Sequence, residues 1–110
     1  VRFSECLALE TEEHRVRVYA MGPGLVRTAM TRYQLDTPQG QRWLARIGRM
    51  FEEGRDVPPE RAGALAVFLA SPEGDAFSGR ALGVQDDPAD LVARADEIRR
   101  SDLYTLRLKK

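Results

Sequence analysis

Apolar and polar residues follow one another along the chain in patterns that predict helices around two strands. Residues 1–13 place their apolar side chains on one side and most of their charges elsewhere, as in an amphipathic helix. Residues 16–21 carry a single charge, which favours a strand buried on both faces. A shorter second strand is predicted around residues 80–84. The chain starts without a capping residue or proline, so we expect it to open within a helix.

Pairs that contain proline predict three more helices. A helix over residues 37–54 begins at a Thr-Pro pair, after a polar connection. A helix over residues 59–70 has the clearest apolar stripe of the chain and ends at a Ser-Pro pair. A last helix follows Pro88, and its apolar positions are Leu91, Ala95 and Ile98. The tail, residues 103–108, predicts no element.

The resulting order of helices and strands is that of an α/β fold, in which strands separated by helices are parallel. Two strands alone do not make a stable sheet of this kind. A strand that is apolar on both faces needs neighbouring strands and two covering layers of helices. We therefore expect the chain to have evolved as part of something longer.

Composition and charge narrow the classes of function. With 43% hydrophobic and 31% charged residues, the chain suits a packed domain. Seventeen basic and seventeen acidic residues cancel, and no charged run is long enough for a nucleic-acid surface. The final pair, Lys109-Lys110, is interpreted as a solvated terminus. No stretch has the pattern of a membrane span or a signal peptide, so we expect a cytoplasmic protein without nucleic-acid or membrane partners.

The first predicted strand ends at Gly22-Pro23-Gly24, because a proline between two glycines cannot continue a central strand. With its flanks, over residues 16–30, this segment closely resembles the short-chain dehydrogenase/reductase family at its sixth strand and the following loop. There the strand is followed by Pro-Gly, any residue, Val or Ile, any residue, and Thr.

Two further segments resemble the same family in the same order. Residues 2–10 look like its helix with the pattern E-x-L-A-x-E, which directly follows the catalytic Tyr-x-x-x-Lys motif. Residues 59–82 contain matches to its closing pattern, P-E … A … F-L-A-S … G-x-x-L. Tyr19 departs from the Asn of many members, and residues 84–87 replace a frequent Asp-Gly-Gly, which suggests a subgroup with an added helix.

The resemblance implies the C-terminal part of a Rossmann-type, doubly wound parallel sheet that binds NAD or NADP. Residues 1–87 would be the C-terminal half of that NAD(P)-binding domain, and residues 88–110 a C-terminal helical extension. The segment that distinguishes NAD from NADP in the family lies outside the matched part. Both coenzymes therefore stay open.

The resemblance also implies a role for four residues after the first strand. Pro23 would lie against the nicotinamide ring, and Gly24 would let the chain turn close to the cofactor. Val26 would offer main-chain groups to the carboxamide, and the Thr28 hydroxyl would bond the carboxamide or a phosphate oxygen. Ligands of open α/β sheets bind beyond the carboxyl ends of the strands, where these residues are expected. The alternative is an ordinary Gly-Pro-Gly turn with Thr28 as a helix cap.

Other residues carry weaker hypotheses. Trp43 and Met50 occupy the region that covers the substrate in the family, so they are candidates for an apolar pocket wall, with helix core as the alternative. His14 is interpreted as a surface residue at a helix end, and Cys6 as a packing residue that has no partner for an internal disulfide. Arg27 could approach a phosphate, but we expect it to be solvated. No Cys/His cluster has metal-ligand spacing, so no metal is expected.

Two functions from different classes follow. In the first, the chain is part of an oxidoreductase that acts on an alcohol/carbonyl pair and commonly assembles as a homo-oligomer. The family's catalytic Ser, Tyr and Lys would lie before Val1, so we expect the chain alone to be inactive. In the second, the chain is a non-catalytic half-domain or degenerate homologue that binds another protein.

Overall fold

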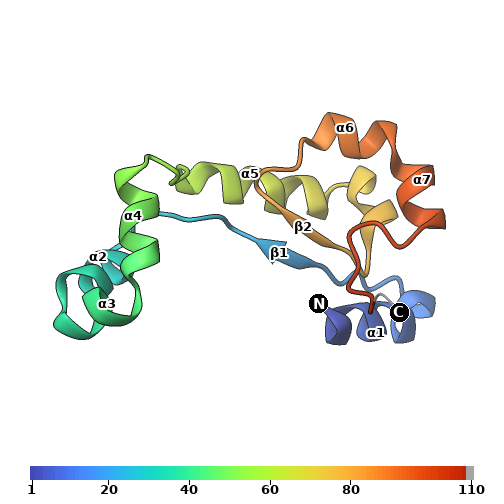
Figure 1. Cartoon of the computed structure of the whole chain (residues 1–110). Coiled ribbons are helices and arrows are strands. Elements are labelled where there is room, and N and C mark those ends of the chain that lie inside the picture. Colours follow the sequence, from blue (N-terminus) through green and yellow to red (C-terminus); the bar gives the residue numbers. More distant parts are fainter. Residues whose placement is uncertain (109–110) are drawn as a thin grey trace.

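A computed structural model of the chain describes residues 1–108; Lys109-Lys110, expected to be a solvated terminus, lie outside the described residues. The molecule is elongated, with extents of 49 × 32 × 26 Å. Its radius of gyration is 16.6 Å, whereas a compact domain of this length has about 13 Å. Figure 1 shows the reason: a sheet with its helices lies at one end and a group of short helices at the other.

The sheet consists of two parallel strands, β1 (Ala20–Gly22) and β2 (Ala81–Gly83). Ala20 lies opposite Ala81, and Gly22 opposite Gly83. The α/β class and the parallel pairing predicted from the sequence are thereby confirmed.

The first strand differs from its prediction in length and burial. It starts at Ala20 rather than at residue 16, and Met21 is 40% exposed although both faces were expected to be buried. The described residues form only two strands, so one edge of β1 has no strand beside it. The apolar run is present, but within the described residues only one edge of β1 is paired with another strand.

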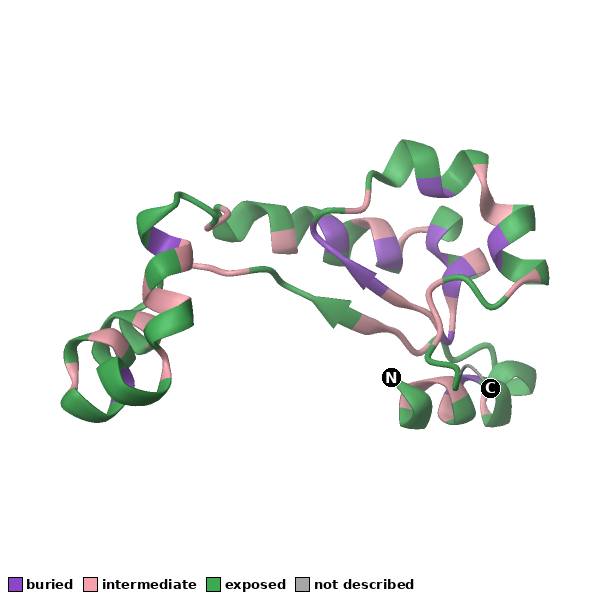
Figure 2. Cartoon of the chain, in the orientation of Figure 1, coloured by how far each residue is buried: buried purple, intermediate pink, exposed green. Residues whose placement is uncertain are grey.

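The sheet is covered by α5 (Pro59–Ala70), η2 (Pro72–Phe77), α6 (Pro88–Ala93) and α7 (Ala95–Arg100), and we call this assembly the sheet body. It holds a continuous hydrophobic core, coloured as buried in Figure 2, that consists of Leu65, Leu69, Phe77, Leu82, Val84, Leu91 and Ile98. The predicted helix over residues 59–70 is confirmed, including its two buried leucines.

The predicted last helix begins as expected but is interrupted. The Asp87 carboxylate accepts a hydrogen bond of 3.2 Å from the Ala89 amide at the N-terminus of α6. Arg94 then leaves helical geometry, with φ −106° and ψ 12°. The break turns α7 onto η2, so that Leu91 and Ile98 enter the same core.

The other end of the molecule consists of α2 (Ala29–Asp36), α3 (Pro38–Trp43) and α4 (Ala45–Glu52), which we call the helical lobe. Two predictions are wrong here. The polar connection before residue 37 contains α2, and the single helix predicted over residues 37–54 breaks at Leu44. Gly40 packs closely against α2, since a β-carbon there would lie 1.3 Å from the Gln34 carbonyl oxygen. Leu44 leaves helical geometry, with φ −115° and ψ 19°, and α4 begins at Ala45.

The chain begins with α1 (Arg2–Glu10) and a short turn, η1 (Glu12–His14), so the first helix ends earlier than predicted. His14 is exposed at the end of this turn, as expected. The expectation that Cys6 packs is wrong, because Cys6 is exposed and Phe3 on the same helix is 78% exposed. Only Ala8 of α1 is buried, since no other described segment covers the rest of its apolar side.

The tail, for which the sequence predicted no element, is held along the sheet body and α1. The Ala81 amide donates a hydrogen bond of 2.8 Å to the Tyr104 carbonyl. Arg80 donates to the carbonyls of Ser101 and Leu103, at 2.9 and 2.8 Å. Within residues 1–108, no helix is long and apolar enough to cross a membrane.

Candidate functional site

The β1–α2 loop, residues 23–28, leaves the carboxyl end of β1 and leads into the helical lobe (Figure 1). Pro23 begins the loop and is exposed. In parallel sheets this edge is where ligands bind, because the loops after the strands meet there. All four residues of the expected cofactor site lie in this loop, with Pro23, Gly24 and Thr28 exposed and Val26 half-buried.

At Gly24 the loop packs closely against neighbouring side chains. Its φ of +77° lies in the left-handed region, which favours glycine. A β-carbon at this position would lie 2.7 Å from a methyl carbon of Val57 and 2.7 Å from one of Val84. The Val57 amide also donates a hydrogen bond of 2.8 Å to the Leu25 carbonyl. Gly24 therefore lies closely packed between Val84, which directly follows β2, and the α4–α5 linker, residues 53–58.

Thr28 is the N-cap of α2, so the helix-cap role considered for it is confirmed. Its hydroxyl oxygen accepts a hydrogen bond of 3.2 Å from the Thr31 amide, while the Thr28 amide donates one of 2.8 Å to the Thr31 hydroxyl. A hydroxyl that accepts still has its own hydrogen to donate. Thr28 is exposed, so capping and ligand binding by this side chain are compatible.

Val26 is half-buried, and its carbonyl accepts a hydrogen bond of 3.1 Å from the Thr31 hydroxyl. Thr31 thus connects the main chain at Val26 to the first turn of α2. Thr31, which the sequence did not single out, therefore contacts the loop at both Val26 and Thr28.

Arg27 was expected to be solvated, and its side chain is indeed 61% exposed, but it also makes hydrogen bonds that the sequence did not predict. Its guanidinium donates to the Asp56 carboxylate at 2.8 and 3.2 Å and to the Phe51 carbonyl at 2.9 Å. These hydrogen bonds hold the pKa of Asp56 below its usual value. No sequence motif connects residues 29 positions apart in two irregular segments, so only the fold reveals the pair.

Two hollows flank this loop on the lobe side. One, of about 200 Å³, is bordered by Arg27, Thr28 and Phe51, and the other, of about 440 Å³, by Arg27 and Phe51 with residues of α3 and α4. Neither is lined by Trp43 or Met50. Trp43 is 74% exposed with Arg42 over its ring, and Met50 is half-buried.

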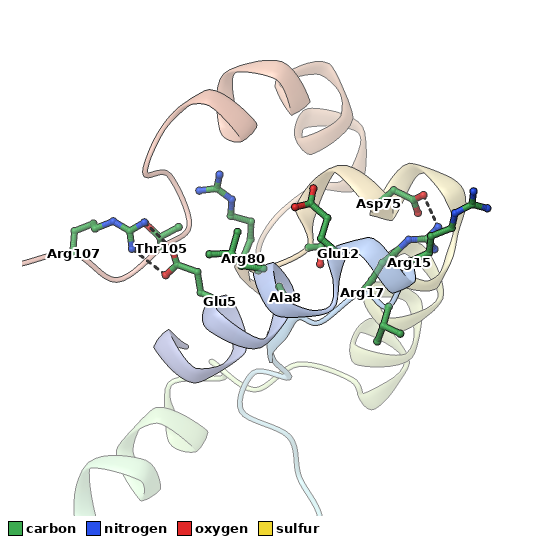
Figure 3. Close-up of a pocket in the computed structure, with 13 residues that line it drawn as sticks. Glu5, Ala8, Glu12, Arg15, Arg17, Asp75, Arg80, Thr105 and Arg107 are labelled. Carbon is green, nitrogen blue, oxygen red and sulfur yellow. Dashed lines mark hydrogen bonds and ion pairs between the residues drawn. The ribbon is translucent and has the colours of Figure 1, made fainter.

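A further hollow, of about 360 Å³, lies between α1, η2 and the tail (Figure 3). Four of its charged groups form two pairs, Arg17 with Asp75 and Arg107 with Glu5. The hydrogen bonds from Arg107 lower the pKa of Glu5 from its usual 4.5 to about 2. The hollow lies beside the residues that precede the two strands, away from the β1–α2 loop. It is therefore not the candidate site.

Sequence comparison identifies the protein family of this chain. Residues 1–86 match the model of a protein family described as enoyl-(acyl carrier protein) reductase. The chain belongs to the short-chain dehydrogenase/reductase family. The match includes both strands and the whole β1–α2 loop, so the resemblance seen in the sequence is confirmed.

Two members of the short-chain dehydrogenase/reductase family are similar to the chain over most of its length. Galactitol 2-dehydrogenase (L-tagatose-forming) of Cereibacter sphaeroides is 36% identical over 84 residues, which is 76% of this chain and 32% of that protein. Dehydrogenase/reductase SDR family member 4 of Bos taurus is 33% identical over 78 residues, 71% of this chain and 27% of that protein. The chain thus spans about three tenths of the length of these relatives. No solved structure matches it at a significant level.

Proposed function

We propose that the chain supplies the nicotinamide-binding loop of an oxidoreductase that uses NAD or NADP and acts on an alcohol/carbonyl pair. The observation that carries this proposal is the β1–α2 loop of a short-chain dehydrogenase/reductase. Its Gly24 has φ +77° and leaves no room for a β-carbon beside Val57 and Val84. One side of this backbone faces solvent, where a flat ligand can bind. Its other side packs against the sheet body.

The residues of the loop suit a nicotinamide. Pro23 is an exposed, rigid apolar surface for one face of the ring. Val26 offers its main chain to the carboxamide, and the Thr28 hydroxyl, already oriented by the Thr31 amide, donates to a carboxamide or phosphate oxygen. When bound, the nicotinamide supplies or accepts the hydride. The chain's own part is to orient that ring by fixed backbone and one fixed hydroxyl.

The substrate side belongs to the helical lobe. Trp43 and Met50 are proposed as apolar surface that helps to enclose a small-molecule alcohol or ketone. The name of the bacterial relative gives galactitol as its substrate and L-tagatose as its product. An alcohol oxidised to a ketone is the reaction class that we carry over to this chain.

The rest of the proposal concerns the complete protein. Residues 1–87 form the C-terminal half of its NAD(P)-binding domain, and residues 88–110 a helical extension. The catalytic Ser, Tyr and Lys belong to a part of the protein outside this chain, so the chain alone is inactive. We place the protein in the cytoplasm, as a homo-oligomer that binds neither nucleic acid nor membrane.

The test compares the isolated chain with the longer protein that contains it. Purified longer protein should oxidise or reduce NAD(P)(H) with a panel of alcohols and ketones, and the isolated chain should not. Gly24→Val in the longer protein should abolish the fluorescence enhancement of bound NADPH or NADH. Gly63→Val, at an exposed glycine of α5 with open space around it, is the matched control. Absence of turnover and of coenzyme binding in the longer protein would favour the non-catalytic binding protein instead.

A further inference from the structure

Two stretches of chain join the helical lobe to the sheet body, the β1–α2 loop and the α4–α5 linker (Figure 1). They run side by side: the Val57 amide of the linker donates to the Leu25 carbonyl of the loop at 2.8 Å. Any movement of the lobe relative to the body must bend both stretches. The contacts between the two stretches therefore set the position of the lobe relative to the loop.

Arg27 makes the strongest of these contacts. Its Nε and Nη2 donate to the two oxygens of the Asp56 carboxylate, at 2.8 and 3.2 Å. Nη2 also donates to the Phe51 carbonyl at 2.9 Å, and the guanidinium lies 4.7 Å from the centre of the Phe51 ring. A planar, bidentate pair that also stacks on a ring holds one relative orientation of its partners.

Phe51 is where this contact reaches the lobe. It is 6% exposed and, among residues 1–108, it is the single buried hydrophobic side chain of the helical lobe. Its carbonyl lies in the last turn of α4, where a cation is favourable, and it accepts from the Gly54 amide at 3.1 Å as well as from Arg27. Arg27 thus binds the end of α4, covers its buried ring and ties both to the linker through Asp56.

We propose that Arg27 is a positioning residue that holds the helical lobe, and with it the substrate wall, against the nicotinamide-binding loop. This inference rests on the proposed function. The Nε and Nη2 groups of Arg27 already donate to Asp56 and Phe51, so we assign this side chain to positioning and not to the coenzyme. The loop keeps its shape without it, through the Leu25–Val57 hydrogen bond and the Thr28–Thr31 capping box. Loss of Arg27 therefore affects the substrate more than the coenzyme.

The experiment uses the longer protein with Arg27→Gln, Arg27→Lys, Asp56→Asn and the double variant Arg27→Gln/Asp56→Asn. Arg27→Gln and Asp56→Asn should each raise the KM for the substrate about tenfold while the Kd of NADPH or NADH changes about twofold or less. The double variant should be no worse than Arg27→Gln, because both changes break the same pair. Arg27→Lys should be intermediate, since lysine keeps the charge but not the bidentate geometry.

Arg46→Gln, at an exposed arginine of α4, is the matched control and should leave both constants unchanged. An unchanged substrate KM in Arg27→Gln, or additive effects in the double variant, would overturn the inference. Hydrogen exchange of the same variants separates this failure from that of the proposed function. If the longer protein has no turnover, faster exchange in α2–α4 but not in α6 of Arg27→Gln still supports the positioning role. Equal exchange in the parent and the variant refutes it.

Discussion

The sheet body and the helical lobe are built from similar numbers of helices but are stabilised in different ways. The body has a continuous core from Leu65 to Ile98, and both Phe77 and Ile98 are fully buried. The lobe buries Phe51 and Gly40 and otherwise relies on caps at Thr28 and Thr37. A hydrophobic core resists local opening, whereas caps and ion pairs hold geometry without much burial.

This difference in packing fits the roles proposed for the sheet body and the helical lobe. The body supplies a rigid support for the β1–α2 loop, because Val84 of the core lies against Gly24. The lobe buries fewer apolar side chains, so we expect it to open locally at a lower cost in free energy than the body. The comparison therefore predicts that substitutions in the body act on the whole fold and those in the lobe act locally.

The largest effect is expected from Phe77→Ala in the body. Removal of this fully buried ring should lower the free energy of unfolding by about 3–5 kcal/mol, measured by urea denaturation. Phe51→Ala should cost about 2 kcal/mol, because the thinly packed lobe can collapse around the gap. Hydrogen exchange should accelerate throughout the body in the first variant and only in α2–α4 in the second. The same pattern in both would contradict the comparison.

Gly24→Ala tests the contact between body and loop. The methyl group would overlap Val57 and Val84 at a left-handed φ, so we expect a loss of about 2 kcal/mol and a weaker affinity for the coenzyme. Gly54→Ala is the matched control, with φ +66° but no atom within 4 Å of the added carbon. It should cost about 1 kcal/mol by conformation alone. Thermal unfolding and fluorescence titration of NADPH measure both variants.

Thr28 has a structural and a proposed binding role that can be separated. Thr28→Ala removes the N-cap of α2 and should cost about 1 kcal/mol, whereas Thr28→Ser should be neutral. Thr28→Asp keeps a capping oxygen but cannot donate a hydrogen bond at neutral pH. It should therefore retain the helix, by circular dichroism, and lose coenzyme affinity. Equal coenzyme affinity in Thr28→Asp and the parent would leave Thr28 with the cap alone.

The smallest effect concerns pH and the tail. Arg107 lowers the pKa of Glu5 from 4.5 to about 2, so the ionised carboxylate is favoured in the folded chain. The stabilisation is present above pH 4.5 and is lost as the pH falls through about 2. The protection of α1 and the tail against hydrogen exchange, corrected for the intrinsic pH dependence of exchange, should therefore fall over this acid range in the parent chain. In Glu5→Gln the protection should be low already at pH 6, and an identical acid profile would exclude the pair as the cause.

Much of the fold could be predicted from local sequence signals. The Pro-Pro start and the i, i+3, i+4, i+7 stripe define α5 because a helix of that length needs only one covered face. The Asp-Pro pair starts α6 for a similarly local reason, a capping carboxylate next to a residue with fixed φ. The family and its β1–α2 loop were also readable, since Pro23 to Thr28 form one contiguous motif.

The sequence by itself determined the α/β class and the position of the loop from signals between near neighbours. It also determined the parallel strands, because strands separated by helices run parallel. Only the tertiary structure decided the rest. No local signal marked the break at Leu44, and the hydrogen bonds of Arg27 depend on Asp56, 29 positions away, lying beside it. Contacts between distant segments leave no periodic trace in a sequence. They form only when the whole chain has folded.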